Sequence, residues 1–371
     1  MQKINILFVI DTLKVGGAEN QFKILVENLN RDRFVVNVCN LGSPSDALLK
    51  DISRFSNVCL TIPQKGKMDL NCLITLTRLI KKMKPHIVNT ILFTAHCYGR
   101  ISALWSKVPV IIASYRNIDL WKRWYHKKVD YILSKKTSHF TANSYALKRY
   151  LISEYNIPSS RVTVIYNGID LSKFKKKEKD SGIFKKLNID SNKKVILTVA
   201  RFSPQKDHYT LIETAKKVIS HYKNVLFLLI GRGPLKKEIE RKINDEGLNN
   251  FFRIIEFVED IEEVYNIACL SISTSLYEGL SNFILESMAC EVPVIATPAG
   301  GNSELIMDNH TGFLVPFKDV EKIAERVIYL LSNPQKAEEI GRRARARVER
   351  MFTIEKMIKR YEDLYIKIAG F

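Results

Sequence analysis

Two glutamates, Glu278 and Glu286, stand in a stretch that is otherwise made of small and apolar residues, SLYEGLSNFILESMACEVPVIAT. Ser281 is a good helix N-cap, so this pattern predicts a helix over residues 282–289, with Glu278 in the loop before it. Unbonded N–H groups at a helix N-terminus bind anions such as a diphosphate. The groups expected to do so here belong to Ser281, Asn282 and Phe283.

Glu286 would lie near the middle of that helix, among apolar residues, where a charge is costly unless it is bonded. A carboxylate has two acceptor oxygens and can bind the vicinal hydroxyls of a ribose. Glu278 could do the same for a sugar. The alternative, a capped helix with surface carboxylates, explains the apolar neighbours of Glu286 poorly. A similar pattern follows the next predicted strand, where Gly300 and Gly301 precede the start of a predicted helix that contains Glu304.

Two cations follow another predicted strand. In VARFSPQKD, Arg201 and Lys206 come just after an apolar run, at the strand edge where ligands of parallel sheets bind. An arginine fork and a lysine point charge together can hold a diphosphate. Two solvated surface cations are the alternative, and the pair alone is weak evidence.

Glycines stand at two further strand ends. Gly231 in LIGRGP suits either a backbone that approaches a nucleotide or an ordinary turn before a helix. Gly16 and Gly17 in GGAE lie between the first strand and the first helix, where the helix N-terminus could face an anion. This turn lacks the GxGxxG dinucleotide fingerprint.

The chain has 371 residues, which suggests two domains. Apolar strand-like runs alternate with helical patterns twice, and a charged stretch separates the two series. We therefore expect an α/β protein with two Rossmann-like domains facing each other across a cleft. The expected parts are a first domain over 1–170, a linker region over 171–192, a second domain over 193–352 and a C-terminal helix over 353–371.

The net charge of +19 is uneven, because residues 1–170 contain 25 Lys and Arg against 11 Asp and Glu. Such a surplus indicates an anionic partner, or else a Lys-rich composition on a solvated surface. Six cysteines show no metal-binding spacing and fit a reducing cytosol. The apolar N-terminal run is typical of a strand rather than a signal peptide.

The order of these motifs resembles retaining glycosyltransferases of the GT-B fold, specifically glycosyltransferase family 4. The resemblance is carried by GGAE, YNGID, R-x4-K, E-x7-E and PVIATPAGG, and it spans nearly the whole chain. It implies that the last helix crosses back to the first domain. It also implies a nucleotide-diphosphate sugar as donor, UDP-linked by our prediction, with neither a metal nor a cofactor.

The resemblance also implies roles for single residues. Arg201 and Lys206 would hold the donor diphosphate and stabilise the leaving group. Glu278 would face the donor sugar and Glu286 the ribose. Gly16 and Gly17 would lie near the diphosphate, and the hinge between the domains would include Asn167, Gly168 and Asp170.

One position departs from many relatives, which have a histidine near the transferring carbon. Here Arg116 and Asn117 follow the corresponding strand. His96 and His126 are other candidates, but a lone histidine is more often structural.

The resemblance therefore predicts a retaining glycosyltransferase that acts on a glycan or lipid-linked hydroxyl in cell-surface polysaccharide, lipopolysaccharide or glycolipid synthesis. The segment over 120–136 mixes aromatics with cations, among them Lys122, and is typical of a helix on an anionic membrane, although it could also be a solvated helix. We expect a cytoplasmic protein that associates with the inner face of the membrane. A sugar-nucleotide epimerase or hydrolase is the alternative function. A nucleic-acid binder would leave the carboxylates unexplained.

Overall fold

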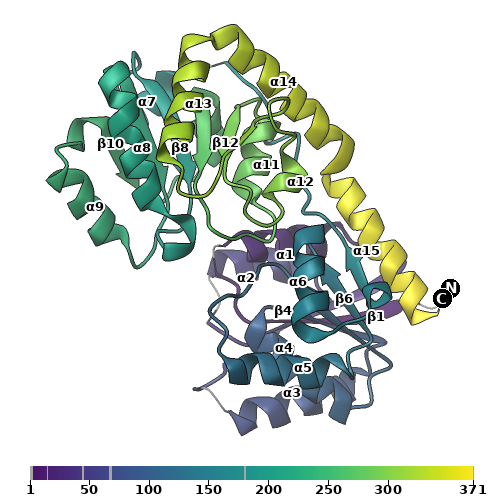
Figure 1. Ribbon diagram of the computed structural model, residues 1–371. Coiled ribbons are helices and arrows are strands. Elements are labelled where there is room, and N and C mark those ends of the chain that lie inside the picture. The colour runs from purple at the N-terminus through teal and green to yellow at the C-terminus, as the bar shows by residue number, and fades with distance from the viewer. Residues whose placement is uncertain (1–2, 15, 44–45, 67–68, 179–180, 371) are drawn as a thin grey trace. The chain divides into compact units, whose positions relative to one another are not determined.

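The computed structural model describes residues 3–14, 16–43, 46–66, 69–178 and 181–370. These fall into two compact units. Unit 1 comprises Met1–Gly168 and Ile354–Phe371, and unit 2 comprises Ile169–Thr353. Both units are α/β, and each has a parallel sheet with helices on its faces (Figure 1).

The sheet of unit 1 has seven strands in the order β3-β2-β1-β4-β5-β6-β7, and every adjacent pair is parallel. Continuous apolar sequences form its central strands because helices cover both faces. The strands are β1 (Ile4–Ile10), β2 (Phe34–Asn40), β3 (Val58–Thr61), β4 (Ile87–Ile91), β5 (Val110–Tyr115), β6 (His139–Ala142) and β7 (Val162–Val164). The helices are α1 (Gly17–Asn28), α2 (Asp46–Arg54), α3 (Leu70–Met83), α4 (Phe93–Trp105), α5 (Trp124–Ser134), α6 (Tyr145–Tyr155) and α15 (Ile354–Ala369).

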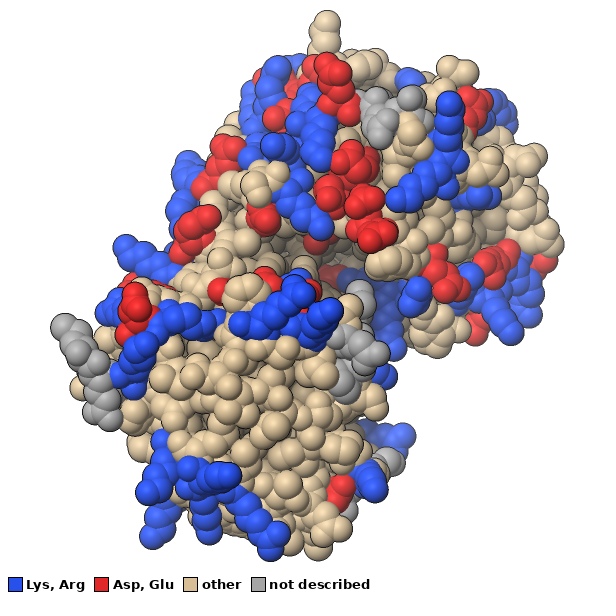
Figure 2. All heavy atoms as spheres, turned by 180° about the vertical axis from the view of Figure 1, so that it is seen from behind, with Lys and Arg blue, Asp and Glu red and all other residues tan. Residues whose placement is uncertain are grey.

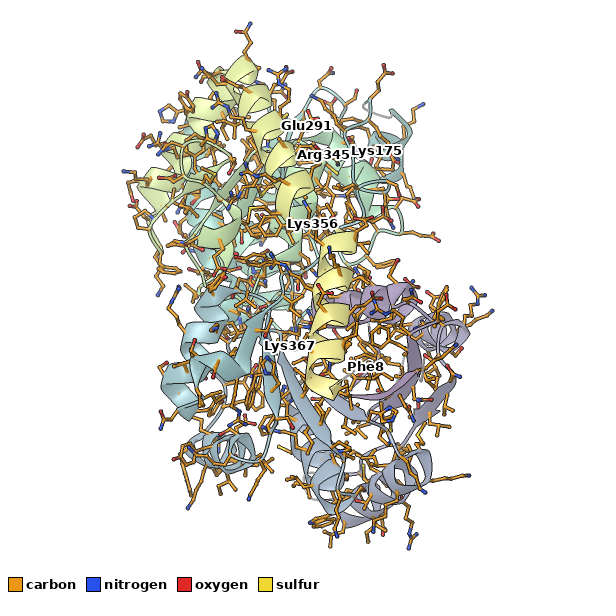
Figure 3. The ribbon with its side chains drawn as sticks, turned by 90° about the vertical axis from the view of Figure 1, so that its right-hand side faces the viewer. Phe8, Lys175, Glu291, Arg345, Lys356 and Lys367 are labelled. Carbon is orange, nitrogen blue, oxygen red and sulfur yellow. The ribbon has the colours of Figure 1, made fainter. Side chains whose placement is uncertain are left out.

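The C-terminal helix α15 belongs to unit 1, as expected from the resemblance. Its apolar side joins the core formed by α1, α2 and one face of the sheet. Phe8, labelled beside α15 in Figure 3, has its ring centroid 6.2 Å from that of Tyr365. The hydroxyl of Tyr365 accepts a hydrogen bond of 2.7 Å from Asn89 Nδ2 on β4. The C-terminal helix α15 therefore completes the core of unit 1.

The sheet of unit 2 has six parallel strands in the order β10-β9-β8-β11-β12-β13. They are β8 (Lys194–Val199), β9 (Val225–Ile230), β10 (Phe252–Ile255), β11 (Ala268–Ser273), β12 (Val294–Ala296) and β13 (Phe313–Leu314). The helices are α7 (Ser181–Lys186), α8 (His208–His221), α9 (Lys236–Asp245), α10 (Ile261–Ile267), α11 (Asn282–Ala289), α12 (Asn302–Leu305), α13 (Val320–Ser332) and α14 (Pro334–Met351). The two sheets confirm the predicted pair of Rossmann-like folds.

Much of the stretch 171–192, which the charge pattern suggests as a linker, packs into unit 2. Phe174 is buried, and its ring centroid lies 5.9 Å from that of Tyr265. Arg345 on α14 (Figure 3) donates hydrogen bonds of 2.6 Å and 2.7 Å to the carbonyls of Phe174 and Ala289. This packing is difficult to predict from the sequence, because most residues of the stretch are charged or polar and only a few apolar side chains contact the core.

Candidate functional site

The loop after β8 carries both predicted cations and is tied to the end of β11. Arg201 has an exposed side chain, and Lys206 lies in a short 3₁₀ turn (Pro204–Lys206) that leads into α8. Thr274 Oγ1 donates to the carbonyls of Lys206 and Asp207, at 2.8 Å and 3.0 Å. The carboxyl ends of these two neighbouring strands therefore fix the position of the lysine.

Lys206 and Glu278 meet directly. Lys206 Nζ forms an ion pair with Glu278 Oε1, and the glutamate is 7% exposed. Gln205 Nε2 lies 3.4 Å from the other carboxylate oxygen and donates a bond of 2.7 Å to the Tyr277 carbonyl. The structure thus brings one predicted cation and one predicted sugar-binding carboxylate into contact.

The turn at Gly300 supports Glu278 from behind. Gly300 has a φ of +52°, and a Cβ atom there would lie 1.9 Å from the carbonyl oxygen of Glu278. The N–H of Gly301 donates a bond of 3.0 Å to the carbonyl of Gly279. Only glycine fits this approach of two backbones, so Gly300 has a clear structural role.

Helix α11 has the predicted bounds and the predicted cap. Ser281 Oγ accepts a hydrogen bond from the N–H of Ile284, and residues 282–289 are helical. Ser281 and Phe283 are buried, whereas Asn282 is partly buried.

Glu286 is partly buried on this helix, and its Oε2 accepts a hydrogen bond of 2.5 Å from the hydroxyl of Tyr265 on α10. Burial raises the pKa of Glu286 to about 7, although the bond from Tyr265 opposes the shift. At neutral pH this carboxyl group can therefore exist in either protonation state. Its other oxygen accepts no hydrogen bond from the described residues.

Unit 2 has a small hollow beside Lys206, and the described lining includes neither Glu278 nor Glu286. The ends of β8 and β11 and the start of α11 line it. Its lining includes Ala200, Lys206, Ser275, Ser281 and Phe283. A lysine, serine hydroxyls and a helix N-terminus around one hollow are the donors that an anion requires.

Gly231 and Gly233 are explained by backbone packing. Gly231 has a φ of +155°, and a Cβ atom there would lie 2.0 Å from the carbonyl oxygen of Ala200. At Gly233 the corresponding distance to the carbonyl oxygen of Phe202 is 2.1 Å. A role of Gly231 in nucleotide binding stays a prediction.

The other predicted residues lie in or next to unit 1. Gly16 precedes α1 with extended backbone, and Gly17 is its first residue. The side-chain amide of Gln21 on α1 bonds both the N–H and the carbonyl of Gly168, at 3.1 Å and 2.9 Å. Asp170, at the start of unit 2, accepts bonds from the N–H groups of Ser172 and Lys173.

Arg116 follows β5 and is buried. Its Nη1 donates a bond of 3.3 Å to Asn167 Oδ1, and its guanidinium carbon lies 5.8 Å from the ring centroid of Tyr361.

The two histidine candidates both have structural contacts. His96 is 1% exposed, with Nδ1 2.8 Å from Thr90 Oγ1, and burial moves its pKa well below the ordinary value. His126 accepts a bond from the N–H of Arg123 at the start of α5.

Sequence reasoning missed three residues of this site: Gln205, Tyr265 and Thr274. Gln205 lies inside the R-x4-K motif, which was a usable signal. Nothing local marks Tyr265 as the partner of Glu286, because the two are 21 residues apart and meet only in the fold. Among the described residues, no group of three or more His, Cys, Asp and Glu side chains could hold a metal ion.

Solved structures with the same fold include that of Anabaena Alr3699/HepE in complex with UDP-glucose. It superimposes with a TM-score of 0.87 at 22% identity, over 97% of this chain and 99% of that one. A glycosyltransferase from Rickettsia africae superimposes with a TM-score of 0.83 at 23% identity, over 99% of each chain.

Curated relatives span nearly the same length. The chain is 25% identical to an Escherichia coli UDP-Gal:alpha-D-GlcNAc-diphosphoundecaprenol alpha-1,3-galactosyltransferase, over 92% of each protein. It is 29% identical to the capsular polysaccharide biosynthesis glycosyltransferase CapM of Staphylococcus aureus, over 85% of this chain and 87% of that one.

Two family models divide the chain between them. The model for Glycosyltransferase Family 4 matches residues 15–173, and the model for Glycosyl transferases group 1 matches residues 180–347. The chain therefore belongs to family 4 of the glycosyltransferases and has the GT-B type of fold.

Proposed function

We propose that this protein transfers a sugar from a UDP-sugar to a hydroxyl of a lipid-linked glycan, with retention of configuration and without a metal ion. The observation that carries the proposal is a hollow of unit 2 that is lined by the capped start of α11 and by Lys206, the ion-pair partner of Glu278. The E. coli relative, named for UDP-Gal and a diphosphoundecaprenol-linked sugar, supports this choice of donor and acceptor.

The ion pair between Lys206 and Glu278 has a use in this reaction. Without a donor, each charge neutralises the other. When a UDP-sugar binds, Lys206 can turn to the diphosphate and Glu278 to a sugar hydroxyl, so neither charge is left unpaired. We assign the ribose to Glu286, whose second oxygen accepts no bond from the described residues.

Chemistry then depends on charge stabilisation. The bond between the anomeric carbon and the diphosphate oxygen breaks, and the acceptor oxygen bonds to the same face of that carbon. The acceptor proton passes to the departing phosphate. Negative charge grows on the diphosphate, where Arg201, Lys206 and the N–H groups of α11 would stabilise it. These cations supply the role that a metal ion would otherwise have.

The first test is a screen of UDP-sugars by thermal shift, because a ligand of the folded state raises the melting temperature. Turnover is then measured with a lipid-linked acceptor, and the anomeric configuration of the product is read by NMR. Retention predicts the same anomer as in the donor. An inverted product, turnover abolished by EDTA, or free sugar released without acceptor would each contradict the proposal.

Arg201→Ala and Lys206→Ala test the charge stabilisation. Each should lower kcat by about 100-fold or more, because a group that acts on developing charge contributes mainly in the transition state. Lys237→Ala, at an exposed site on α9, is the matched control and should keep full activity. Since Lys206→Ala also leaves Glu278 unpaired, Lys206→Ala/Glu278→Gln should stay equally slow. Near-normal turnover of the Arg201→Ala/Lys206→Ala double variant would overturn the assignment.

We also propose that the protein works at the cytoplasmic, anionic face of a membrane. All six cysteines are free, which suits a reducing compartment. None of the described helices is both long and apolar enough to cross a bilayer.

A further inference from the structure

Helix α5 turns Asp130 and Ser134 inward beside Leu133 and leaves its other large apolar side chains exposed. Asp130 and Ser134, which are 0% and 3% exposed, face the interior of unit 1. Trp124 is 74% exposed, and Ile132 is 56% exposed. A surface helix normally buries its apolar stripe and exposes its charges, so this orientation needs a cause.

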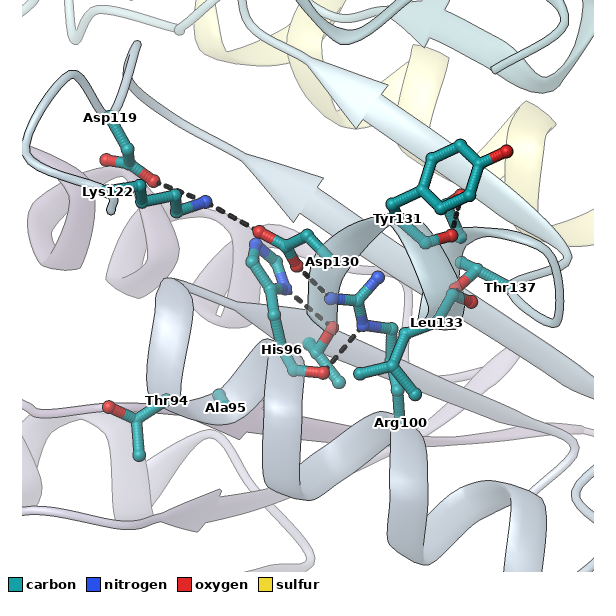
Figure 4. A network of polar contacts seen from close by, with 12 residues as sticks. Thr94, Ala95, His96, Arg100, Asp119, Lys122, Asp130, Tyr131, Leu133 and Thr137 are labelled. Atoms are coloured by element: carbon teal, nitrogen blue, oxygen red, sulfur yellow. Dashed lines mark hydrogen bonds and ion pairs between the residues drawn. The ribbon is translucent and has the colours of Figure 1, made fainter. Parts of the chain in front are cut away.

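Buried ion pairs supply that cause (Figure 4). Asp130 pairs with Arg100 of α4 through Oδ1 and with Lys122 through Oδ2, the latter at 2.8 Å. Lys122 also lies 3.0 Å from Asp119 Oδ2. The expectation that Lys122 is a surface cation is therefore wrong, because its ammonium group is fully buried. Turning α5 over would break these pairs, so its apolar side must remain outside.

The exposed apolar side chains form one patch, which we call the aromatic patch. Each of its members is at least 39% exposed. They are Trp121, Trp124, Tyr125, Val129, Tyr131 and Ile132. Trp and Tyr are the residues that favour the boundary between water and lipid, since each combines an apolar ring with a polar atom.

Exposed cations lie on α5 and next to its two ends. Arg123, Lys128, Lys135 and Lys136 are exposed, and the sole acid of α5, Asp130, is buried. The ammonium group of Lys135 lies 4.5 Å from the ring centroid of Tyr131. Figure 2, which views the molecule from behind, shows that Lys and Arg also outnumber Asp and Glu at the foot of unit 1 on that other side. Such charge attracts anionic lipid headgroups.

We propose that the aromatic patch binds the surface of an anionic bilayer, with its rings among the headgroups and its cations on the phosphates. A second copy of this chain fits the patch less well, because a symmetric interface would set the same cations against each other. This inference extends the proposed function by naming the surface that contacts the membrane. Binding of the aromatic patch to lipid does not itself require sugar transfer.

The test is flotation with two kinds of vesicle, one of phosphatidylcholine and one of equal parts phosphatidylcholine and phosphatidylglycerol. At low salt the protein should float with the anionic vesicles only. Lys128→Gln/Lys135→Gln/Lys136→Gln should weaken binding by roughly 100-fold, because each lysine near the surface contributes separately. Trp124→Ser/Val129→Ser/Ile132→Ser should weaken it by at least about tenfold.

Matched controls lie in unit 2, where Phe257 and Phe317 are exposed by 57% and 46%. Phe257→Ser/Phe317→Ser should float like the wild type, and so should Lys223→Gln/Lys237→Gln. Melting curves establish that each variant is folded, and UDP-sugar affinity should be unchanged in the patch variants. Loss of flotation with intact sugar binding therefore separates this inference from the proposed function.

Three outcomes would overturn the inference. The wild type could stay with the unbound fraction at low salt, or the patch variants could float as well as the wild type. Light scattering could also show a wild-type dimer that the triple serine variant converts to a monomer, which would make the patch a self-association surface.

Discussion

Glu286 should make the binding of a UDP-sugar depend on pH near neutrality. Burial raises the pKa of this carboxyl to about 7, well above its ordinary value of 4.5. Ribose hydroxyls donate to the ionised form. Between pH 6 and pH 8 the ionised fraction rises from about one tenth to about nine tenths, so affinity should rise by roughly tenfold.

The assay is calorimetric titration with UDP-glucose, or with whichever UDP-sugar gives the largest thermal shift. Its diphosphate is esterified at both ends and does not titrate in this range, so the slope reports on the protein. Glu286→Gln should bind roughly 10–150-fold more weakly at pH 8, which corresponds to the about 1.5–3 kcal/mol of a hydrogen bond to a charged group. Its profile should be flat.

Tyr265→Phe is the matched variant, because it removes the 2.5 Å hydrogen bond that lowers the pKa of Glu286. The midpoint of its pH profile should move upward. The free protein should show the opposite sign in stability: folding raises this pKa, so the protonated form favours the fold, and that contribution is lost as pH rises through about 7. Unchanged affinity in Glu286→Gln, or a pH slope that survives in it, would refute the reasoning.

Two further predictions concern unit 1 and the glycine turn. Asp130→Asn should cost about 3–5 kcal/mol, because buried Arg100 loses its ion-pair partner and buried Lys122 keeps only Asp119, and the melting temperature should fall by roughly 6–20 °C. Burial alone would raise the pKa of Asp130, but Arg100 and Lys122 lower it to about 2, so the stabilisation should persist down to about pH 4 and disappear as pH falls through 2. Asp119→Asn, which removes a partly exposed partner of Lys122, should cost at most about 1 kcal/mol; equal losses in the two variants would contradict this. Gly300→Ala should lower turnover by up to about 100-fold, because its Cβ would displace Glu278. Gly247→Ala is the control, because Gly247 also has a positive φ, +66°, but has open space around it. This variant should suffer only backbone strain and keep its activity. Similar turnover in the two variants would show that Gly300 does not support Glu278.

Local signals predicted both the bounds and the cap of α11, because an N-cap at Ser281 and the apolar run behind it act within a few residues. The alternation of apolar runs and helical patterns predicted both sheets for the same reason. The partner of Glu286 and the support behind Glu278 could not be predicted, since Tyr265 and Gly300 reach them only through the fold. The orientation of α5 could not be predicted either, because nothing in the sequence distinguishes the buried Lys122 from the exposed cations near it.

The ion pairs under α5 have a consequence for detergents. Most surface helices are held by apolar contacts, and lipid tails or detergent chains compete with these because they solvate apolar side chains equally well. Asp130, Arg100 and Lys122 meet where such molecules offer no polar group in exchange. An amphiphile that covers the outside of α5 therefore leaves its inner attachment intact, so the protein should tolerate extraction by mild detergents that loosen ordinary amphipathic helices.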